Sequence, residues 1–206
     1  ITLQKSLFCV IIEYMAKIVV ANWKMNPQSQ KEAEVLFGET SHLVNGVKNA
    51  KVVVCPPFPF LSISQKFKNK KIFLGAQNVS KEEGGSYTGE VSPKMLASMG
   101  VDYAIVGHGE ERALGETNKI VNEKILNLLK FKLLPILCVG ERSRDNKGGY
   151  LSFVENQLTE CLEGVSRANM KNIVIAYEPI WAIGANAVRE ATVEEFMEMK
   201  IFIKKV

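Results

Sequence analysis

Three apolar stretches of this chain are followed directly by polar residues that could do chemistry. Asn22 and Lys24 follow the first stretch, His108 follows the second after one glycine, and Glu178 follows the third. A carboxylate that leaves a buried strand into an apolar segment has its ionised form partly desolvated, which makes it a stronger base. Glu178 is therefore the candidate general base.

The segment after Glu178 is unusually apolar for a loop. It reads Pro-Ile-Trp-Ala-Ile-Gly over residues 179–184, with apolar residues between a rigid proline and a permissive glycine. This composition suits a hinged lid that closes over a ligand and excludes water. It suits equally a segment that packs permanently against the rim of the fold, and composition does not choose between the two.

The other candidates also have purely structural interpretations. Lys24 could simply be solvated at a strand end. His108, which opens an expected short helix, could make a structural hydrogen bond instead of taking part in catalysis. The second histidine, His42, falls within an amphipathic stretch, and we expect it to be a solvated helix residue with no chemistry.

Apolar runs and amphipathic segments alternate along the chain and must position these residues. Short runs rich in β-branched residues, with little polar alternation, are typical of buried parallel strands. Thr192, three residues before Glu195, predicts a capping box that opens a final helix. The predicted strands are 18–21, 52–55, 72–74, 103–106, 134–139 and 173–177, and the predicted helices include 33–47, 120–131 and 151–162.

This alternation, with a repeat of roughly thirty residues, predicts an α/β fold. It fits either an unfinished (β/α)8 barrel or a doubly wound open sheet. Periodicity alone does not choose between them. In both folds, however, ligands meet the carboxyl ends of the strands, so residues such as Lys24, His108 and Glu178 are expected at a site.

Composition argues against several classes of protein. Of the 206 residues, 47% are hydrophobic and 23% are charged, as in one ordinary globular domain. The formal charge of +4 is spread along the chain, so no nucleic-acid partner is indicated. The four cysteines lack disulfide-framework or metal-ligand spacing, which indicates a reduced, cytosolic chain without zinc. No stretch reaches the ~18 apolar residues of a membrane span.

Taken together, the motifs at the strand ends resemble one family. An Asn-x-Lys motif, a Gly-His pair and the sequence Glu-Pro-x-Trp-Ala-x-Gly follow three different strands in that order. Over residues 17–206 the chain resembles the triosephosphate isomerases. The resemblance implies a (β/α)8 TIM barrel, incomplete here with about six βα units. Further matching stretches lie at 75–78, 87–90 and 138–141.

The resemblance implies a role for each residue that matches a motif. Glu178 would move a proton between two substrate carbons. His108 would act as a neutral electrophile, a role of histidine for which this family is the usual example. Lys24 would stabilise developing negative charge, and Asn22 would add a hydrogen bond near the same oxygen. Gly184 would offer a backbone N–H to the substrate phosphate.

The implied reaction interconverts glyceraldehyde 3-phosphate and dihydroxyacetone phosphate, in glycolysis and gluconeogenesis. The resemblance implies no metal and no organic cofactor. It also implies a cytoplasmic location and a homodimer for the full-length protein. The expected partner is a small phosphorylated triose, with no nucleic acid and no membrane.

Three positions depart from the family pattern. Gly109 stands where a serine usually holds the base in its resting position. Glu111 reverses a charge near the expected subunit contact, and Ala185 replaces the threonine that usually follows the lid glycine. We expect these changes to affect the base, the dimer geometry and the hinge, respectively.

Residues 17–206 are expected to form a partial barrel that lacks the last two βα units, because the sequence stops inside the sixth helix. The first and sixth strands would then be apolar edges with unpaired backbone groups. The Gly-rich phosphate loops of the absent units would be lost, so weak binding and slow turnover are expected. Residues 1–16 are an N-terminal extension of no assigned role, and Met15 is the expected start of translation.

Two other functions stay open. The chain could be an inactive barrel fragment that needs a complementary fragment or partner. It could also be another phosphate-binding barrel or open-sheet ligand binder, although that hypothesis does not explain why Lys24, His108 and Glu178 occur together.

Overall fold

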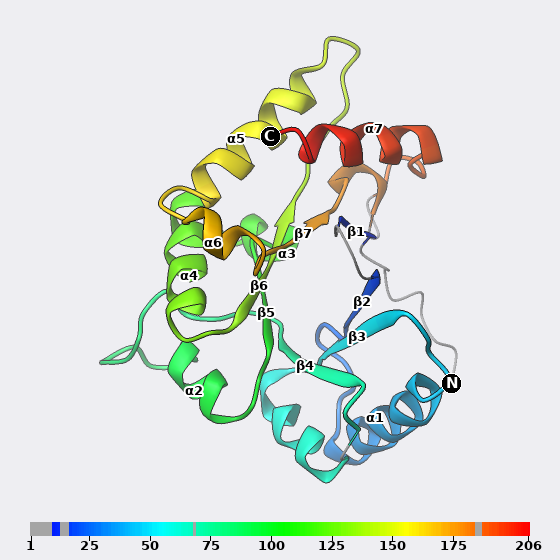
Figure 1. The fold of residues 1–206 in the computed structure, drawn as a ribbon, viewed down its shortest axis with the longest axis vertical. Coiled ribbons are helices and arrows are strands. Elements are labelled where there is room, and N and C mark those ends of the chain that lie inside the picture. The colour runs from blue at the N-terminus through cyan, green and yellow to red at the C-terminus, as the bar shows by residue number, and fades with distance from the viewer. Residues whose placement is uncertain (1–9, 13–16, 68, 184–186) are drawn as a thin grey trace.

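The computed structural model describes residues 10–12, 17–67, 69–183 and 187–206 (Figure 1). Their seven strands form one sheet in the order β1-β7-β6-β5-β4-β3-β2. The strands are β1 (Val10–Ile12), β2 (Lys17–Asn22), β3 (Ala50–Cys55), β4 (Ile72–Ala76), β5 (Tyr103–Val106), β6 (Leu134–Val139) and β7 (Val174–Tyr177). The helices are α1 (Gln30–Val44), α2 (Pro93–Ser98), α3 (Gly109–Ala113), α4 (Asn118–Lys130), α5 (Gly149–Cys161), α6 (Arg167–Met170), α7 (Val193–Ile203) and the 3-10 helices η1 (Phe58–Lys66) and η2 (Ile180–Ala182).

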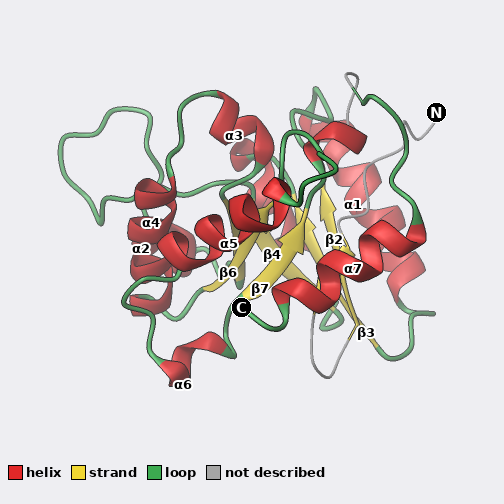
Figure 2. Ribbon diagram, turned by 90° about the horizontal axis from the view of Figure 1, so that it is seen from above, coloured by secondary structure: helices red, strands yellow, loops and turns green. Residues whose placement is uncertain are grey.

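Strands β2 to β7 run parallel and pair in chain order. The sheet that they form is curled, and Figure 2 shows the strands at the centre with helices around them. An open doubly wound sheet would reverse its strand order at a switch point, and this sheet does not. The predicted α/β fold is confirmed as an incomplete (β/α)8 barrel.

Successive residues of each strand point to opposite faces of the curled sheet, and both faces are buried. Val52 and Val54 of β3 pack outward against Ala33 and Phe37 of α1. The residues between them in the sequence pack inward, where side chains of five of the strands meet. This inner cluster consists of Ile18, Val20, Val53, Cys55, Tyr103, Ile105, Ile136, Cys138, Val174 and Ala176.

Each predicted strand overlaps an observed one, and the predicted helices overlap α1, α4 and α5. The capping box of α7 is also confirmed. The Thr192 hydroxyl accepts the N–H of Glu195 (3.2 Å), and the Glu195 carboxylate accepts the N–H of Thr192 (2.8 Å). None of the described helices combines the length and the apolar character needed to cross a membrane.

One strand was not predicted. Val10–Ile12 forms β1, which pairs antiparallel with Ile175–Tyr177 of β7. The prediction that the sixth parallel strand leaves an unpaired edge is therefore wrong for these residues. An edge strand offers a row of backbone donors and acceptors, and an extended segment that reaches it can satisfy them. Strand β2 lies at the other edge of the sheet, where the first parallel strand was predicted to lie.

The start of α7 gives a testable pH dependence. Arg189 donates hydrogen bonds to Glu195 (Nη2–Oε1 2.6 Å), and with the Thr192 N–H it lowers the pKa of Glu195 to about 2. An unfolded glutamate titrates near ~4.3. Because the folded pKa lies below the unfolded one, Glu195 stabilises the fold above about pH 4, and this contribution is lost as the pH falls toward about 2.

We expect Glu195→Gln to flatten the loss of stability in this pH window, as measured by chemical denaturation at stepped pH. Glu194→Gln is the matched control, because Glu194 is an exposed carboxylate in the same helical turn. Equal pH slopes for the two variants would contradict the assignment.

Candidate active site

Glu178 follows β7 directly and continues the inward series of Val174 and Ala176 to the carboxyl end of the barrel. Its residue is only 7% exposed. The carboxylate has three long contacts: Oε1 lies 3.6 Å from His108 Nε2, the Cys138 thiol donates to Oε1 at 3.4 Å, and the Gly109 N–H donates to Oε2 at 3.5 Å. Glu178 is therefore buried but loosely held.

The backbone of Glu178 is fixed far more tightly than its carboxylate. Its N–H donates to the Val139 carbonyl at 2.8 Å. A Cβ atom added to Gly140 would lie 1.9 Å from the Glu178 carbonyl oxygen. Gly140 is required here because two strand ends approach closely, so β6 sets where the base leaves β7.

The turn that carries His108 is held from both sides. Gly107 has φ +71°, a conformation that favours glycine. Its N–H donates to Glu116 (2.9 Å) and its carbonyl accepts from Arg112 Nε (2.7 Å). The side chain of Glu116 is only 5% exposed and pairs with Lys124 (Nζ–Oε1 2.5 Å).

The hydrogen bonds of His108 assign its protonation state in this arrangement. His108 is the N-cap of α3, and its Nδ1 accepts the N–H of Glu110 at 3.2 Å. A ring nitrogen that accepts a hydrogen bond carries no proton, so the ring is neutral and its proton lies on Nε2. Nε2 is the nitrogen that faces Glu178.

Lys24 has a left-handed backbone (φ +54°), which costs a non-glycine residue roughly 1–3 kcal/mol. Two side chains hold it there: Asn22 Oδ1 accepts the Lys24 N–H, and Gln77 Nε2 donates to the Lys24 carbonyl, both at 2.9 Å. The strained turn directs the ammonium group toward Glu110 (Nζ–Oε1 2.7 Å). The Lys24 side chain keeps 41% exposure, so it can be reached from solvent.

Glu110 links Lys24 to His108. Partial burial raises the pKa of Glu110, but the hydrogen bond and the charge of Lys24 outweigh it and bring the pKa below its usual value. Glu110 therefore stays ionised at neutral pH. One of its oxygens pairs with Lys24, and the other lies 3.6 Å from His108 Nδ1.

The structure thus brings four of the five predicted site residues together. Asn22 contacts Lys24, Lys24 joins His108 through Glu110, and His108 faces Glu178. They come from the ends of β2, β5 and β7 at one mouth of the barrel. The fifth, Gly184, lies outside the described residues, as does Ala185.

Sequence reasoning missed three contributors to this mouth: Glu110 as the partner of Lys24, Gln77 as a brace for its backbone, and Cys138 beside the base. A signal existed for Cys138. It shares the inward alternation of Ile136 on β6, which leads to the same rim.

The apolar segment after Glu178 begins as η2, and its Trp181 is only 6% exposed. The indole N–H donates to Glu141 at 2.8 Å, and the Tyr177 hydroxyl donates to the same carboxylate at 2.8 Å. Arg189 lies over the indole, 4.5 Å from its centroid. The described start of the segment is therefore packed on the rim, which fits the second of the two interpretations.

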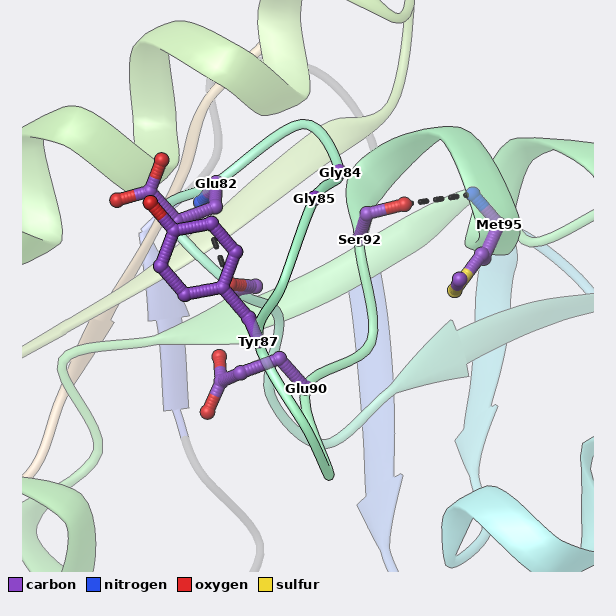
Figure 3. Close-up of a pocket in the computed structure, with 8 residues that line it drawn as sticks. Glu82, Gly84, Gly85, Tyr87, Glu90, Ser92 and Met95 are labelled. Carbon is purple, nitrogen blue, oxygen red and sulfur yellow. Dashed lines mark hydrogen bonds between the residues drawn. The ribbon is translucent and has the colours of Figure 1, made fainter.

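A small hollow beside α2 is not a competing site (Figure 3). Its volume of about 60 Å³ is far below the roughly 300–1,000 Å³ of typical ligand pockets. Neither Glu178 nor His108 lines it. The residues that line the hollow are Ser80, Glu82, Gly84, Gly85, Tyr87, Glu90, Ser92 and Met95.

In the part of the chain that the structure describes, no three His, Cys, Asp or Glu side chains are placed to hold a metal ion.

Comparison with known proteins agrees with this geometry. Residues 17–206 match the family model described as triosephosphate isomerase. The chain is 40% identical to the triosephosphate isomerase of Dictyoglomus thermophilum over 193 residues, which covers 92% of this chain and 76% of that protein. It is 45% identical to the enzyme of Thermoanaerobacter pseudethanolicus over 187 residues, covering 88% and 73%.

The chain belongs to the triosephosphate isomerase family. The predicted resemblance and the isomerase class are thereby confirmed. The chain spans about three quarters of the length of the triosephosphate isomerases that it matches. Two of the positions that depart from the family pattern lie in the described residues. Gly109, in place of the usual serine, has no side chain, and its backbone N–H donates to Glu178. Glu111 lies in α3.

The contact between Gly140 and Glu178 predicts a sharp effect of one methyl group. Gly140→Ala would place a Cβ against the Glu178 carbonyl, and overpacking of this kind typically costs ~1–3 kcal/mol or more. We expect a lower melting temperature together with lower isomerase activity. Gly46→Ala is the matched control, because Gly46 is exposed and its added Cβ would lie 3.6 Å from the nearest backbone oxygen. Equal melting temperatures for the two variants would argue against the contact.

Proposed function

We propose that this chain interconverts glyceraldehyde 3-phosphate and dihydroxyacetone phosphate, with Glu178, His108 and Lys24 as its catalytic residues. The observation that carries the proposal is the buried Glu178 carboxylate facing Nε2 of His108 at 3.6 Å, while Nδ1 of the same ring accepts the N–H of Glu110. A base and a hydrogen-bond donor at that separation can act on neighbouring atoms of one small substrate.

Glu178 takes a proton from the substrate carbon next to the carbonyl group. The electron pair of the broken C–H bond forms a carbon–carbon double bond, and negative charge develops on the carbonyl oxygen. The proton of the neighbouring hydroxyl group passes to the former carbonyl oxygen, so that the neighbouring carbon becomes the new carbonyl carbon. The protonated Glu178 returns its proton to the former carbonyl carbon, so that the reaction consumes nothing. Because Glu178 is buried, little water reaches its carboxylate during the transfer.

His108 and Lys24 stabilise the charge that develops on oxygen. The Nε2–H of His108 donates to the oxygen, and the ammonium group of Lys24 attracts it. In the structure Lys24 is paired with Glu110, so the substrate must compete with that carboxylate for the ammonium group. Asn22 acts on the same oxygen through Lys24, because its Oδ1 accepts the N–H of Lys24 and so holds the strained backbone of that residue. Gly184 is the proposed backbone donor to the phosphate.

Replacing the base tests the proposal. Glu178→Gln keeps the size of the side chain but cannot accept a proton, so the isomerisation rate should fall by about 10²–10⁴-fold or more. The rate is measured by deuterium incorporation from solvent into the substrate carbons. Glu155→Gln is the control, because Glu155 is an exposed glutamate on the outer helix α5, and it should retain the parental rate.

The same assay separates this proposal from the inactive-fragment hypothesis, which no observation on the described residues favours. An unaltered chain that isomerises neither triose phosphate would reject the proposed function. Equal rates for the unaltered chain and for Glu178→Gln would reject Glu178 as the base.

We further propose that the protein acts as a cytoplasmic homodimer. Cys55 and Cys161 are buried free thiols, as suits a reducing compartment. Met25, next to the catalytic Lys24, is 84% exposed. Burial of such a side chain against a second copy would contribute ~1.5–3 kcal/mol to assembly.

Sedimentation velocity should give twice the mass of one chain. Met25→Lys should shift the protein toward single chains, because association would bury the added charge. Met170→Lys is the control: Met170 is also exposed, but it lies in α6, before β7 and at the opposite end of the barrel. Sedimentation of the unaltered protein as single chains at every concentration would reject the dimer.

A further inference from the structure

The buried Glu141 carboxylate holds the chain on both sides of Glu178. The hydroxyl of Tyr177, the residue before Glu178, donates to Glu141 Oε1 at 2.8 Å and lies 3.0 Å from Oε2. The indole N–H of Trp181, which follows Glu178 closely in the chain, donates to the same Oε1 at 2.8 Å. An acceptor that is left unpaired away from water is costly. Release of Trp181 from the rim is therefore unfavourable unless another donor replaces the indole.

Arg144 lies beside this carboxylate with a donor that has no acceptor. Its Nη1 is 3.8 Å from Glu141 Oε1, the oxygen that the Trp181 indole occupies. This separation is too long for a hydrogen bond. Nη1 is buried, and no described residue accepts a hydrogen bond from it. Buried donors without an acceptor are rare in native proteins, so this one requires a physical reason.

The rest of the Arg144 guanidinium is fixed by two helices. Its Nη2 donates to Glu198 of α7, and its Nε lies 3.9 Å from Oε1 of Glu195 in the same helix. Its Cζ lies 4.2 Å from the ring centroid of Tyr150, which belongs to α5. These contacts keep the cation next to Glu141. A movement of Nη1 by about 1 Å would bring it within hydrogen-bond distance of Oε1.

We propose that Arg144 is a reserve donor for Glu141, meaning that its Nη1 takes the place of the Trp181 indole when that side chain leaves the rim. In the described arrangement the indole donates to Oε1 and Nη1 is unpaired. In the alternative arrangement Nη1 donates to Oε1, Tyr177 keeps its hydrogen bond, and the indole is released. The segment after Glu178 can then be both packed on the rim and released from it, which joins the two interpretations of its apolar composition.

The direction of one effect separates a reserve donor from a packing contact. Arg144→Met removes the guanidinium and keeps an unbranched side chain. Because the reserve donor is lost, release of Trp181 becomes less favourable, and its indole N–H should exchange with deuterium about three- to tenfold more slowly. Loss of a side chain that only packs on the rim would loosen Trp181 and speed the exchange. The exchange is followed by NMR, with the Trp23 indole as an internal reference.

Arg189→Met is the matched control. The Arg189 guanidinium also lies over the Trp181 indole, 4.5 Å from its centroid, compared with 6.0 Å for Arg144. Arg189 pairs with Glu195, however, and no ion pair joins it to Glu141 among the described residues. Arg189→Met should therefore speed the exchange of the Trp181 indole, which is the opposite of the effect expected for Arg144→Met.

A second experiment measures stability and structure. Trp181→Phe keeps an aromatic ring but removes the N–H, so Arg144 should move onto Glu141. This substitution should raise the unfolding equilibrium constant about five- to tenfold more in the Arg144→Met chain than in the unaltered chain, because Glu141 then has neither the indole nor the guanidinium. A crystal structure of Trp181→Phe should place Nη1 of Arg144 within about 3.2 Å of Glu141 Oε1.

Three results would overturn the reserve donor. The first is unchanged or faster exchange of the Trp181 indole in Arg144→Met. The second is an effect of Trp181→Phe that is equal or smaller in the Arg144→Met chain. The third is a Trp181→Phe structure in which Nη1 stays beyond hydrogen-bond distance of Glu141, and this test decides even where Arg144→Met fails to fold. A chain without isomerase activity would reject the function proposed above and leave these tests unaffected.

Discussion

The site depends on a carboxylate that is buried while almost nothing binds it tightly. A buried ionised group is costly unless it is paired or hydrogen-bonded, yet the contacts of the Glu178 carboxylate with described residues are all 3.4 Å or longer. Its backbone, in contrast, is fixed by Val139 and by the close approach of Gly140. The fold therefore fixes where Glu178 starts and holds its carboxylate only through long contacts. A carboxylate with a fixed backbone and long contacts can reach a substrate carbon from a defined starting point, which is what a general base must do.

The second part of the site balances charge around the imidazole. Glu110 carries a lowered pKa because Lys24 pairs with it, so an anion and a cation sit beside His108 in the structure. The backbone N–H of Glu110, not its carboxylate, makes the hydrogen bond to Nδ1. This leaves the ring neutral with its proton on Nε2, toward Glu178. An anionic substrate that reaches the exposed Lys24 would therefore meet a cation and a hydrogen-bond donor on one side and the base on the other.

Much of this arrangement could be predicted from the sequence, because it follows from local pattern. Continuous apolar runs predicted all the parallel strands, and their carboxyl ends predicted where Lys24, His108 and Glu178 gather. What could not be predicted depends on contacts between distant segments. The β1 strand is too short to show a period, and it pairs with β7 only because that edge is open to it. Glu110 appears in the sequence as an ordinary helix-start glutamate, and only the turn at Lys24 makes it a partner of that ammonium group.

Three glycines near the base show the same limit most clearly, because a different physical reason favours glycine at each position. Gly107 is fixed by its own backbone, which is left-handed, and a turn motif can suggest that from sequence. Gly140 and Gly109 are fixed by neighbours, the Glu178 carbonyl in one case and a methyl group of Ile180 in the other. The Gly140 contact joins two strand backbones, so it constrains any sequence that keeps this strand spacing. The Gly109 contact meets the free end of one flexible side chain, which can move aside, so it constrains position 109 far less than the Glu178 carbonyl constrains position 140.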